Sequence, residues 1–392
     1  MRIVGTLLLS LFLILLGRPC FSNPGSLESA ISMKDFEGGK TLTASELAAD
    51  LNYLSFAMSN AYSGFTFVPN KGSQTVLNDL ATWPVPASMN SMDFYKVLNS
   101  ETGKIQDDHF LVFLQRPSAP RPGIGVGSNF GKQVKSVWEM NWYDTGHQVP
   151  VVSIHAFQTP GSDWNGFATT IQNLMQSSRT IIIDLRDNGG GDDSEGKVLA
   201  QQLLDSDSFP TPYKSASLMQ NPYSLEIFLN AIDWMALNWP GSDSSGWAQM
   251  KQQTEGKLKQ ALNGTLPAVE VQDFSKQNPI AGRHAYTGKV YVLINRNTAS
   301  SGESTTDYLG ALPFAKVVGE NSAGAIHFGT MGLIELPNSK IVISLGIDYL
   351  AYRDGSFHEL TGINPSVRVP DGQDALDYIV GTDNLCSKIP AK

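Results

Sequence analysis

The sequence predicts an α/β fold, because short β-branched and aliphatic runs alternate with segments of helical periodicity. The alternation occurs in two rounds, one from about residue 106 and one after about residue 286. The first round is a strand at Val151–Ile154, a helix at Trp164–Gln176, a strand at Thr180–Leu185 and a helix at Glu195–Leu204. Such alternation favours strands joined by crossover connections.

The second round continues the same pattern towards the C-terminus. It comprises a strand at Lys289–Asn295, a helix at Ser301–Leu312, and strands at Ala315–Val318, Gly332–Leu336 and Lys340–Leu345. Residues 206–286 separate the two rounds and contain proline-rich turns with two predicted helices, Leu225–Leu237 and Gly246–Leu262. We interpret 206–286 as an insertion that could act as a lid.

A small helical N-terminal domain is predicted for residues 23–105, before a core domain at 106–392. Leu47, Leu51, Leu54 and Met58 recur at helical spacing, after a Thr43–Glu46 start that resembles a capping box. Two further helices are expected, at Thr75–Leu80 and Ser91–Leu98.

Residues 1–22 have the layout of a secretory signal peptide. Arg2 precedes the uncharged, mostly apolar run Ile3–Leu16, and small residues end it near Ser22. We therefore expect an exported protein, periplasmic or secreted. The run is too short to span a bilayer comfortably, and no later stretch approaches the roughly 20 apolar residues needed, so no transmembrane segment is expected in the mature chain. Arg18-Pro19 before Cys20 disfavours a lipoprotein.

Charge and composition limit the classes of molecule that the protein is expected to bind. Removal of the signal peptide would leave 26 basic and 37 acidic residues, a net charge of −11, which argues against nucleic acid or anionic membranes as main partners. Cys386 would then be the one remaining thiol, which excludes an intrachain disulfide. The histidines form no His-Glu-x-x-His motif, so neither a metal nor another cofactor is expected. The oligomeric state cannot be inferred from the sequence.

Two strand-to-helix turns carry candidate chemistry. In Val292–Glu303 a buried strand passes through a polar turn into a helix, whose first N–H groups would face a developing negative charge. Ser300 or Ser301 could supply a nucleophile there, or only an N-cap. In Ile181–Asp192 three glycines follow a strand, where exposed N–H groups could form an oxyanion hole or the glycines a plain turn. Asp184 and Arg186 are expected to order this loop.

Together these turns resemble the C-terminal-processing (tail-specific) and tricorn-type serine peptidases. The family pairs a strand ending in Asp-Leu-Arg-x-Asn-x-Gly-Gly with a later Ser/Thr-Ala-Ser-x-x-Glu turn. The matching segments are Asp184–Gly191, Thr298–Glu303, Val317–Glu320, Gly362–Pro365 and Val152–Phe157. The resemblance implies a ClpP/crotonase-like peptidase core of ββα type. It also implies Ser300 as the nucleophile, with the Ser301 N–H and that of Gly189 or Gly190 as the oxyanion hole.

The base differs from that of the tail-specific branch, which uses a lysine where this chain has Ala325. The tricorn-like branch instead pairs a histidine before the core with a glutamate after it, and the resemblance then implies His109 as base and Glu359 as its orienter. His327 and His358 remain alternatives. His147, His155 and His284 are expected to be structural or surface residues.

We therefore expect an exported serine endopeptidase that acts on polypeptides. A non-catalytic binding protein on the same fold is the main alternative. An esterase ranks lower, because the Gly-x-Ser-x-Gly elbow is missing. The interval between His109 and Val151 is too short for the PDZ domain often inserted in tail-specific members. Specificity is then expected from the insertion, whose Trp234, Trp239 and Trp247 could line a site or form its own core.

Overall fold

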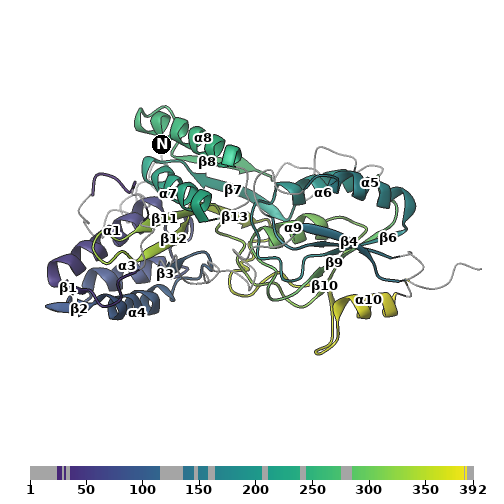
Figure 1. Cartoon of the computed structure of the whole chain (residues 1–392), viewed down its shortest axis with the longest axis horizontal. Helices are drawn as coiled ribbons and strands as arrows, with labels where there is room; N and C mark the ends of the chain where they lie inside the picture. Colours follow the sequence, from purple (N-terminus) through teal and green to yellow (C-terminus); the bar gives the residue numbers. More distant parts are fainter. Residues whose placement is uncertain are drawn as a thin grey trace, which may run out of the picture.

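The computed structural model of the chain describes the following residues: 24–28, 31, 36–114, 136–144, 149–157, 164–204, 211–238, 244–274, 285–383 and 385. The expected signal peptide at 1–22, Cys386, Trp239, His147 and His284 lie outside these residues. Figure 1 shows two lobes, a helical one that holds the N-terminal segment and one built on a central sheet.

The central sheet has six strands in the order β14-β10-β9-β6-β5-β4. The strands are β4 (Trp138–Trp142), β5 (Pro150–Ile154), β6 (Thr180–Asp184), β9 (Lys289–Ile294), β10 (Ala315–Gly319) and β14 (Val367–Arg368). All neighbours pair in parallel except β4, which is antiparallel to β5. This arrangement confirms the α/β fold that the alternation predicted.

Helices cover both faces of this sheet (Figure 1). They are α5 (Phe167–Ser177), α6 (Ser194–Leu204), α9 (Ser301–Gly310) and α10 (Ala375–Thr382). Successive strand residues point to opposite faces. Accordingly, Ile183 and Val292 pack with α5, α6 and α9, whereas Ile182 and Leu293 pack with α10. Burial on both faces explains why these strands are continuous apolar runs.

The N-terminal helices are α1 (Ala44–Ala61), α2 (Ser63–Phe67), α3 (Ser73–Thr82) and α4 (Ser91–Thr102), beside the short strands β1 (Thr41–Thr43) and β2 (Ser88–Asn90). The predicted capping box is confirmed: Glu46 N donates to Thr43 Oγ1 at 3.3 Å, and Thr43 N donates to the Glu46 carboxylate at 2.8 Å.

These helices do not bury their apolar faces among themselves alone. They share one core with residues of β3 (Leu111–Phe113), β11 (Met331–Glu335) and β12 (Val342–Gly346), which form an antiparallel sheet. Leu54 and Phe94 lie in the same buried cluster as Ile334 and Ile343. The expected N-terminal unit is therefore completed by strands from near the other end of the chain.

The insertion contains the two predicted helices, α7 (Pro222–Asn238) and α8 (Ser244–Leu262), flanked by strands β7 (Tyr213–Met219) and β8 (Val269–Asp273). β7 pairs on one side with β8 and on the other with β13 (Asp348–Tyr352). α7 packs closely on β11: Gly332 of β11 lies so near to Ile227 of α7 that an added Cβ would be 2.4 Å from the Ile227 side chain. Trp234 and Trp247 are buried in a cluster with Leu333 of β11.

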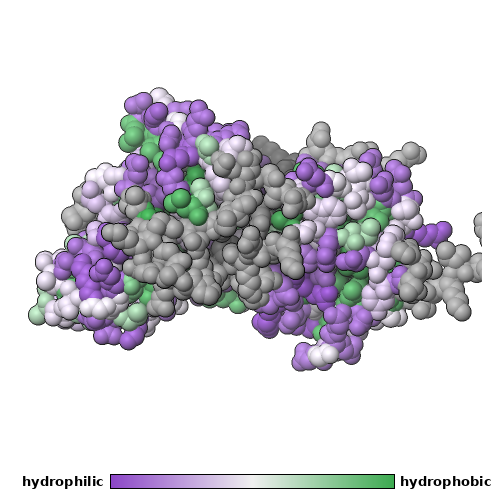
Figure 2. All heavy atoms as spheres, viewed as in Figure 1, coloured by the Kyte–Doolittle hydropathy of each residue, from purple (hydrophilic) through white to green (hydrophobic). Residues whose placement is uncertain are grey.

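The face seen in Figure 2 is mainly hydrophilic where it is described, with small hydrophobic patches over the α7–α8 hairpin. Among the described residues, no helix has the length and apolar character to cross a bilayer. Nor does that part of the chain bring three or more His, Cys, Asp or Glu side chains together as a metal site.

Candidate active site

Ser300 lies where β9 turns into α9, with a backbone φ of 53°. This positive φ is uncommon for a residue with a side chain, and such strain persists only where the surroundings hold it. Two features of the surroundings hold Ser300 in this conformation. The Ser300 N–H donates to the Glu303 carboxylate at 3.1 Å, and a Cβ added to Gly190 would lie only 2.6 Å from the Ser300 Cβ. Gly190, itself at φ +101°, must therefore be a glycine for the turn to close.

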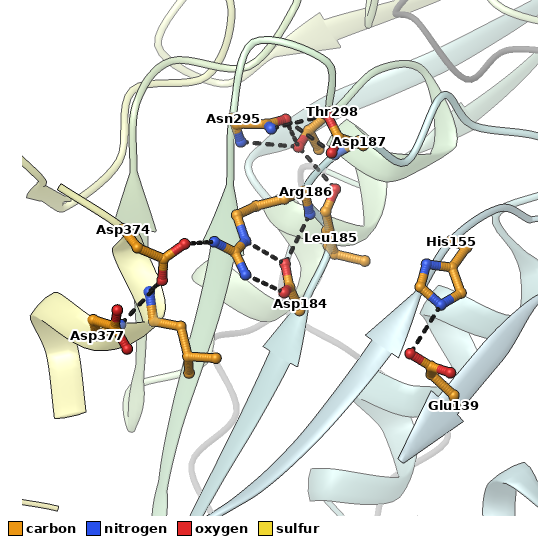
Figure 3. Close-up of polar contacts among 11 residues, drawn as sticks. Glu139, His155, Asp184, Leu185, Arg186, Asp187, Asn295, Thr298, Asp374 and Asp377 are labelled. Carbon is orange, nitrogen blue, oxygen red and sulfur yellow. Dashed lines mark hydrogen bonds and ion pairs between the residues drawn. The ribbon is translucent and has the colours of Figure 1, made fainter. Parts of the chain in front are cut away.

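The two turns predicted from the sequence lie side by side and are bonded to each other (Figure 3). Asp187 Oδ1 accepts from the side-chain amides of Asn295 at 3.0 Å and Asn297 at 2.7 Å. Thr298 Oγ1 donates to the Leu185 carbonyl at 2.8 Å. These contacts fix the glycine loop against the serine turn.

Arg186 orders the base of the glycine loop. Its guanidinium donates to Asp184 at 2.8 and 2.6 Å and to Asp374, the N-cap of α10, at 2.7 Å (Figure 3). These ion pairs support the ordering role predicted for Asp184 and Arg186. His155 lies apart, in an exposed pair with Glu139 at 3.6 Å.

The glycine loop also positions candidate oxyanion donors. The Gly190 N–H is already bonded to Asn188 Oδ1 at 2.9 Å. The N–H groups of Gly191 and Ser301 donate no hydrogen bond to another described residue, and both residues line the same cavity as Ser300. The geometry therefore favours the Gly191 N–H, together with the Ser301 N–H, as the pair of oxyanion-hole donors. The sequence predicts the N–H of Gly189 or Gly190, which precede Gly191, in this role. The sequence motif could not distinguish three consecutive glycines.

Glu303 connects the serine turn to the segment where the tail-specific branch has its lysine. Its buried carboxylate accepts from Gly324 N at 2.9 Å, Ala325 N at 2.8 Å and Ser322 Oγ at 2.5 Å. Burial raises the pKa of Glu303 to about 7. Ala325 itself is fully buried and packs against Ala299, so a small apolar group occupies the expected lysine position.

His109 contacts Ser300, with 3.2 Å between His109 Nε2 and Ser300 Oγ. The imidazole is buried, and burial lowers the pKa of His109 from 6.5 to about 4. It is therefore neutral at pH 7, as a group must be to accept a proton from a serine hydroxyl. Segments far apart in the sequence meet here: His109 lies two residues before β3, and Ser300 is the N-cap residue of α9.

The two alternative histidines are bonded elsewhere. His327 Nδ1 lies 2.6 Å from the Leu350 carbonyl, and its Nε2 accepts from the His358 N–H at 2.9 Å. His358 Nε2 lies 2.9 Å from Ser356 Oγ. Both ring nitrogens of His327 are thus engaged in holding the segment that carries Glu359.

Two buried carboxylates lie behind His109. Asp107 Oδ1 accepts the His109 backbone N–H at 2.7 Å and lies 4.0 Å from His109 Nδ1, while its Oδ2 accepts from Tyr62 OH at 2.7 Å. Glu359 accepts from the backbone N–H groups of Asp108, Ile326 and His327 at 3.1, 2.8 and 2.6 Å.

Glu359 binds backbone N–H groups and makes no hydrogen bond to the His109 imidazole among the described residues, so its orienting role remains a prediction. His109 Nδ1 is buried and has no hydrogen-bond partner among the described residues. Asp107 is the carboxylate that faces it. Burial raises the pKa of Asp107 to about 7, and burial together with the Asp107 charge raises that of Glu359. Asp107 lies in the segment Asp107-Asp108-His109, but its sequence does not reveal this contact, and no sequence motif indicates Tyr62.

Comparisons with known proteins identify the family of the chain. The sequence model of peptidase family S41 matches residues 148–369, more than half of the chain. The chain therefore belongs to peptidase family S41 and is a serine-type peptidase. A search of curated proteins found no sequence match.

Two solved structures share the fold. A candidate peptidase from Parabacteroides merdae superposes with a TM-score of 0.53 at 15% identity, over 88% of this chain and 98% of its own. Mature CPAF superposes with a TM-score of 0.50 at 15% identity, over 88% of this chain and 96% of its own. At this identity the likeness concerns the fold alone.

Proposed function

We propose that the chain is a serine endopeptidase that cleaves polypeptides through an acyl-enzyme on Ser300, with His109 as the base. The observation that carries the proposal is the 3.2 Å separation of His109 Nε2 and Ser300 Oγ at a strained turn. A non-catalytic binding protein would need neither the contact nor the strain. The small residue at Ala325, in place of a lysine, favours the tricorn-like branch of the family.

The reaction follows from the positions of these groups. His109 Nε2 accepts the Ser300 proton as Ser300 Oγ attacks the peptide carbonyl carbon, and the carbonyl oxygen accepts from the N–H groups of Ser301 and Gly191. The C–N bond then breaks, and His109 returns the proton to the leaving amine. Water then attacks the acyl carbon as His109 takes its proton, and His109 returns that proton to Ser300 Oγ as the ester bond breaks and the acid product leaves.

Asp107 and Glu359 support the base in different ways in this proposal. An imidazolium forms during the reaction, and its Nδ1–H needs a negative partner. Asp107 lies 4.0 Å from that atom, close enough to stabilise the charge. Glu359 instead orients His109 through the backbone, because it binds the N–H of Asp108.

We expect Asp107→Asn to lower kcat/KM by about 10³–10⁴-fold, the loss typical of a triad aspartate, and Glu359→Gln to lower it less. The pH profile supplies a readout that a merely structural role would not move. In the wild type kcat/KM should rise with pH through about 7, as Asp107 ionises. In Asp107→Asn that limb should move down towards the pKa of His109, about 4. A larger loss in Glu359→Gln, with an unmoved limb in Asp107→Asn, would assign the charge-stabilising role to Glu359.

We also propose that the protein is exported, with cleavage of its signal peptide near Ser22. The support is the charged start and short apolar run of residues 1–22. After expression in a secreting host, N-terminal sequencing of the extracytoplasmic protein should begin at or near Asn23. A protein recovered only inside the cell, with Met1 intact, would contradict export.

A further inference from the structure

A cavity of about 540 Å³ opens beside Ser300, within the range of about 300–1,000 Å³ typical of ligand-binding pockets. Both lobes of the molecule line it. Its lining includes His109, Ser300 and Ser301. It also includes apolar side chains of the insertion and its neighbours: Phe228 and Met235 of α7, Trp247 and Met250 of α8, Met331 of β11 and Ala216 of β7.

Part of the apolar lining of the cavity belongs to the hydrophobic core. Met235 and Trp247 are buried in one cluster with Leu333 of β11 and Val342 of β12. This anchoring means that the wall exists before a substrate arrives, so little ordering is needed on binding. The three methionines, Met235, Met250 and Met331, add flexible side chains, which adapt their shape to different apolar partners.

Of the carboxylates that line the cavity, Asp193 and Asp348 are paired within the protein, and Asp192 Oδ1 accepts from the Ser194 N–H at 2.9 Å. Asp193 binds Lys197 at 2.7 Å and accepts from Tyr308 OH at 2.6 Å. Asp348 accepts from Thr330 Oγ1 at 2.8 Å and from the Gly329 N–H. Their hydrogen-bonding capacity is thus largely used. The apolar side chains of the lining are therefore the groups most available to contact a substrate.

We propose that this wall, defined by Phe228, Met235, Trp247 and Met250, binds a large apolar side chain of the substrate near the scissile bond. The proposal rests on the proposed peptidase activity at Ser300 and names the substrates it acts on. These are polypeptides with an aromatic or long aliphatic residue at one fixed position relative to the cleaved bond. Burying such a side chain against the wall removes apolar surface from water, which favours binding.

The test maps cleavage sites by mass spectrometry in a mixed pool of unfolded peptides. The wild type should cleave beside Phe, Leu, Met or Tyr at one position. Met250→Glu places a charge on the wall, which disfavours apolar burial. It should lower kcat/KM for those peptides by about tenfold or more and weaken the preference. Gln252→Glu, at an exposed position on the same helix, is the matched control and should leave the map unchanged.

A second variant covers the case in which Met250→Glu fails to fold. Ala216→Leu narrows the cavity from β7 without adding charge and should shift cleavage towards smaller residues. Fluorophosphonate labelling, which needs Ser300 but not the wall, is measured alongside. A wild-type preference for basic residues, or for no particular residue, would contradict the proposed role of the apolar wall. So would cleavage maps that stay unchanged in both folded variants. In either case, labelling of Ser300 would still support the proposed peptidase function. Loss of both labelling and cleavage in the wild type would reject the two together.

Discussion

Ser300→Ala is expected to lower kcat/KM for peptide hydrolysis by about 10⁴–10⁶-fold, the range seen when a serine protease loses its nucleophile. The reason is that Ser300 Oγ is the hydroxyl in contact with His109 Nε2 within the described part of the chain. The neighbouring Ser301 Oγ instead donates to the Gly191 carbonyl at 2.6 Å. A quenched peptide or casein-type substrate measures the loss.

The matched control for this variant is Ser177→Ala on α5. Ser177 is an exposed serine whose hydroxyl donates to the Asn173 carbonyl at 2.7 Å, far from the site. It should keep wild-type kcat/KM. Retention of more than about a tenth of the activity in folded Ser300→Ala would assign the reaction to another group. A short-chain aryl ester, assayed in parallel, separates the peptidase from the esterase alternative.

His109→Ala is expected to have an effect of similar size, a loss of about 10⁴–10⁶-fold in kcat/KM. Without the imidazole, the Ser300 proton has no acceptor in contact with it, and the leaving amine has no proton donor. The residual rate should rise steadily with pH, because hydroxide then replaces the base. Progress curves between pH 6 and 10 measure both properties.

His155→Ala is the control for a lost histidine, because its exposed imidazole pairs with Glu139 outside the site. It should keep the wild-type rate and pH profile. If His109→Ala kept a rate within tenfold of the wild type and the same pH profile, the base would have to be sought elsewhere. His327 would be a poor substitute, since both its nitrogens are already bonded.

Much of the fold could be predicted because its signals are local. The strands of the central sheet are apolar runs covered on both faces, and the periodicity of α5, α6, α7 and α8 was sufficient to place them. The strands β7 and β8 were missed. In β7 the buried positions Tyr213, Ser217 and Met219 include a serine, so no apolar alternation is visible in the sequence. β8 is mostly exposed and has no buried alternating pattern.

The pairing of distant segments could not be predicted in the same way. β3, β11 and β12 complete the core of the N-terminal helices, although more than 200 residues separate Phe113 from Val342, which pair in the sheet. Nothing in the local sequence of α1 or α4 indicates which strands will cover them. The shared core arises only from tertiary packing.

The candidate site likewise has a part that local motifs predict and a part that depends on tertiary packing. Ser300, His109 and the glycine loop lie in motifs that the sequence displays. Tyr62 and the orientation of Asp107 depend on how α1 and α2 meet the segment before β3, which no motif records. The choice of Gly191 over Gly190 depends on one side-chain bond, from Gly190 N to Asn188 Oδ1.

The central claim is that Ser300 is an activated nucleophile, and covalent labelling tests it most directly. The wild-type protein is treated with a fluorophosphonate, digested with trypsin and analysed by tandem mass spectrometry. We predict one adduct per chain, on Ser300, within the peptide that spans residues 297–316. An unlabelled protein, or an adduct on Ser301, Ser304 or a residue outside this peptide, would contradict the account.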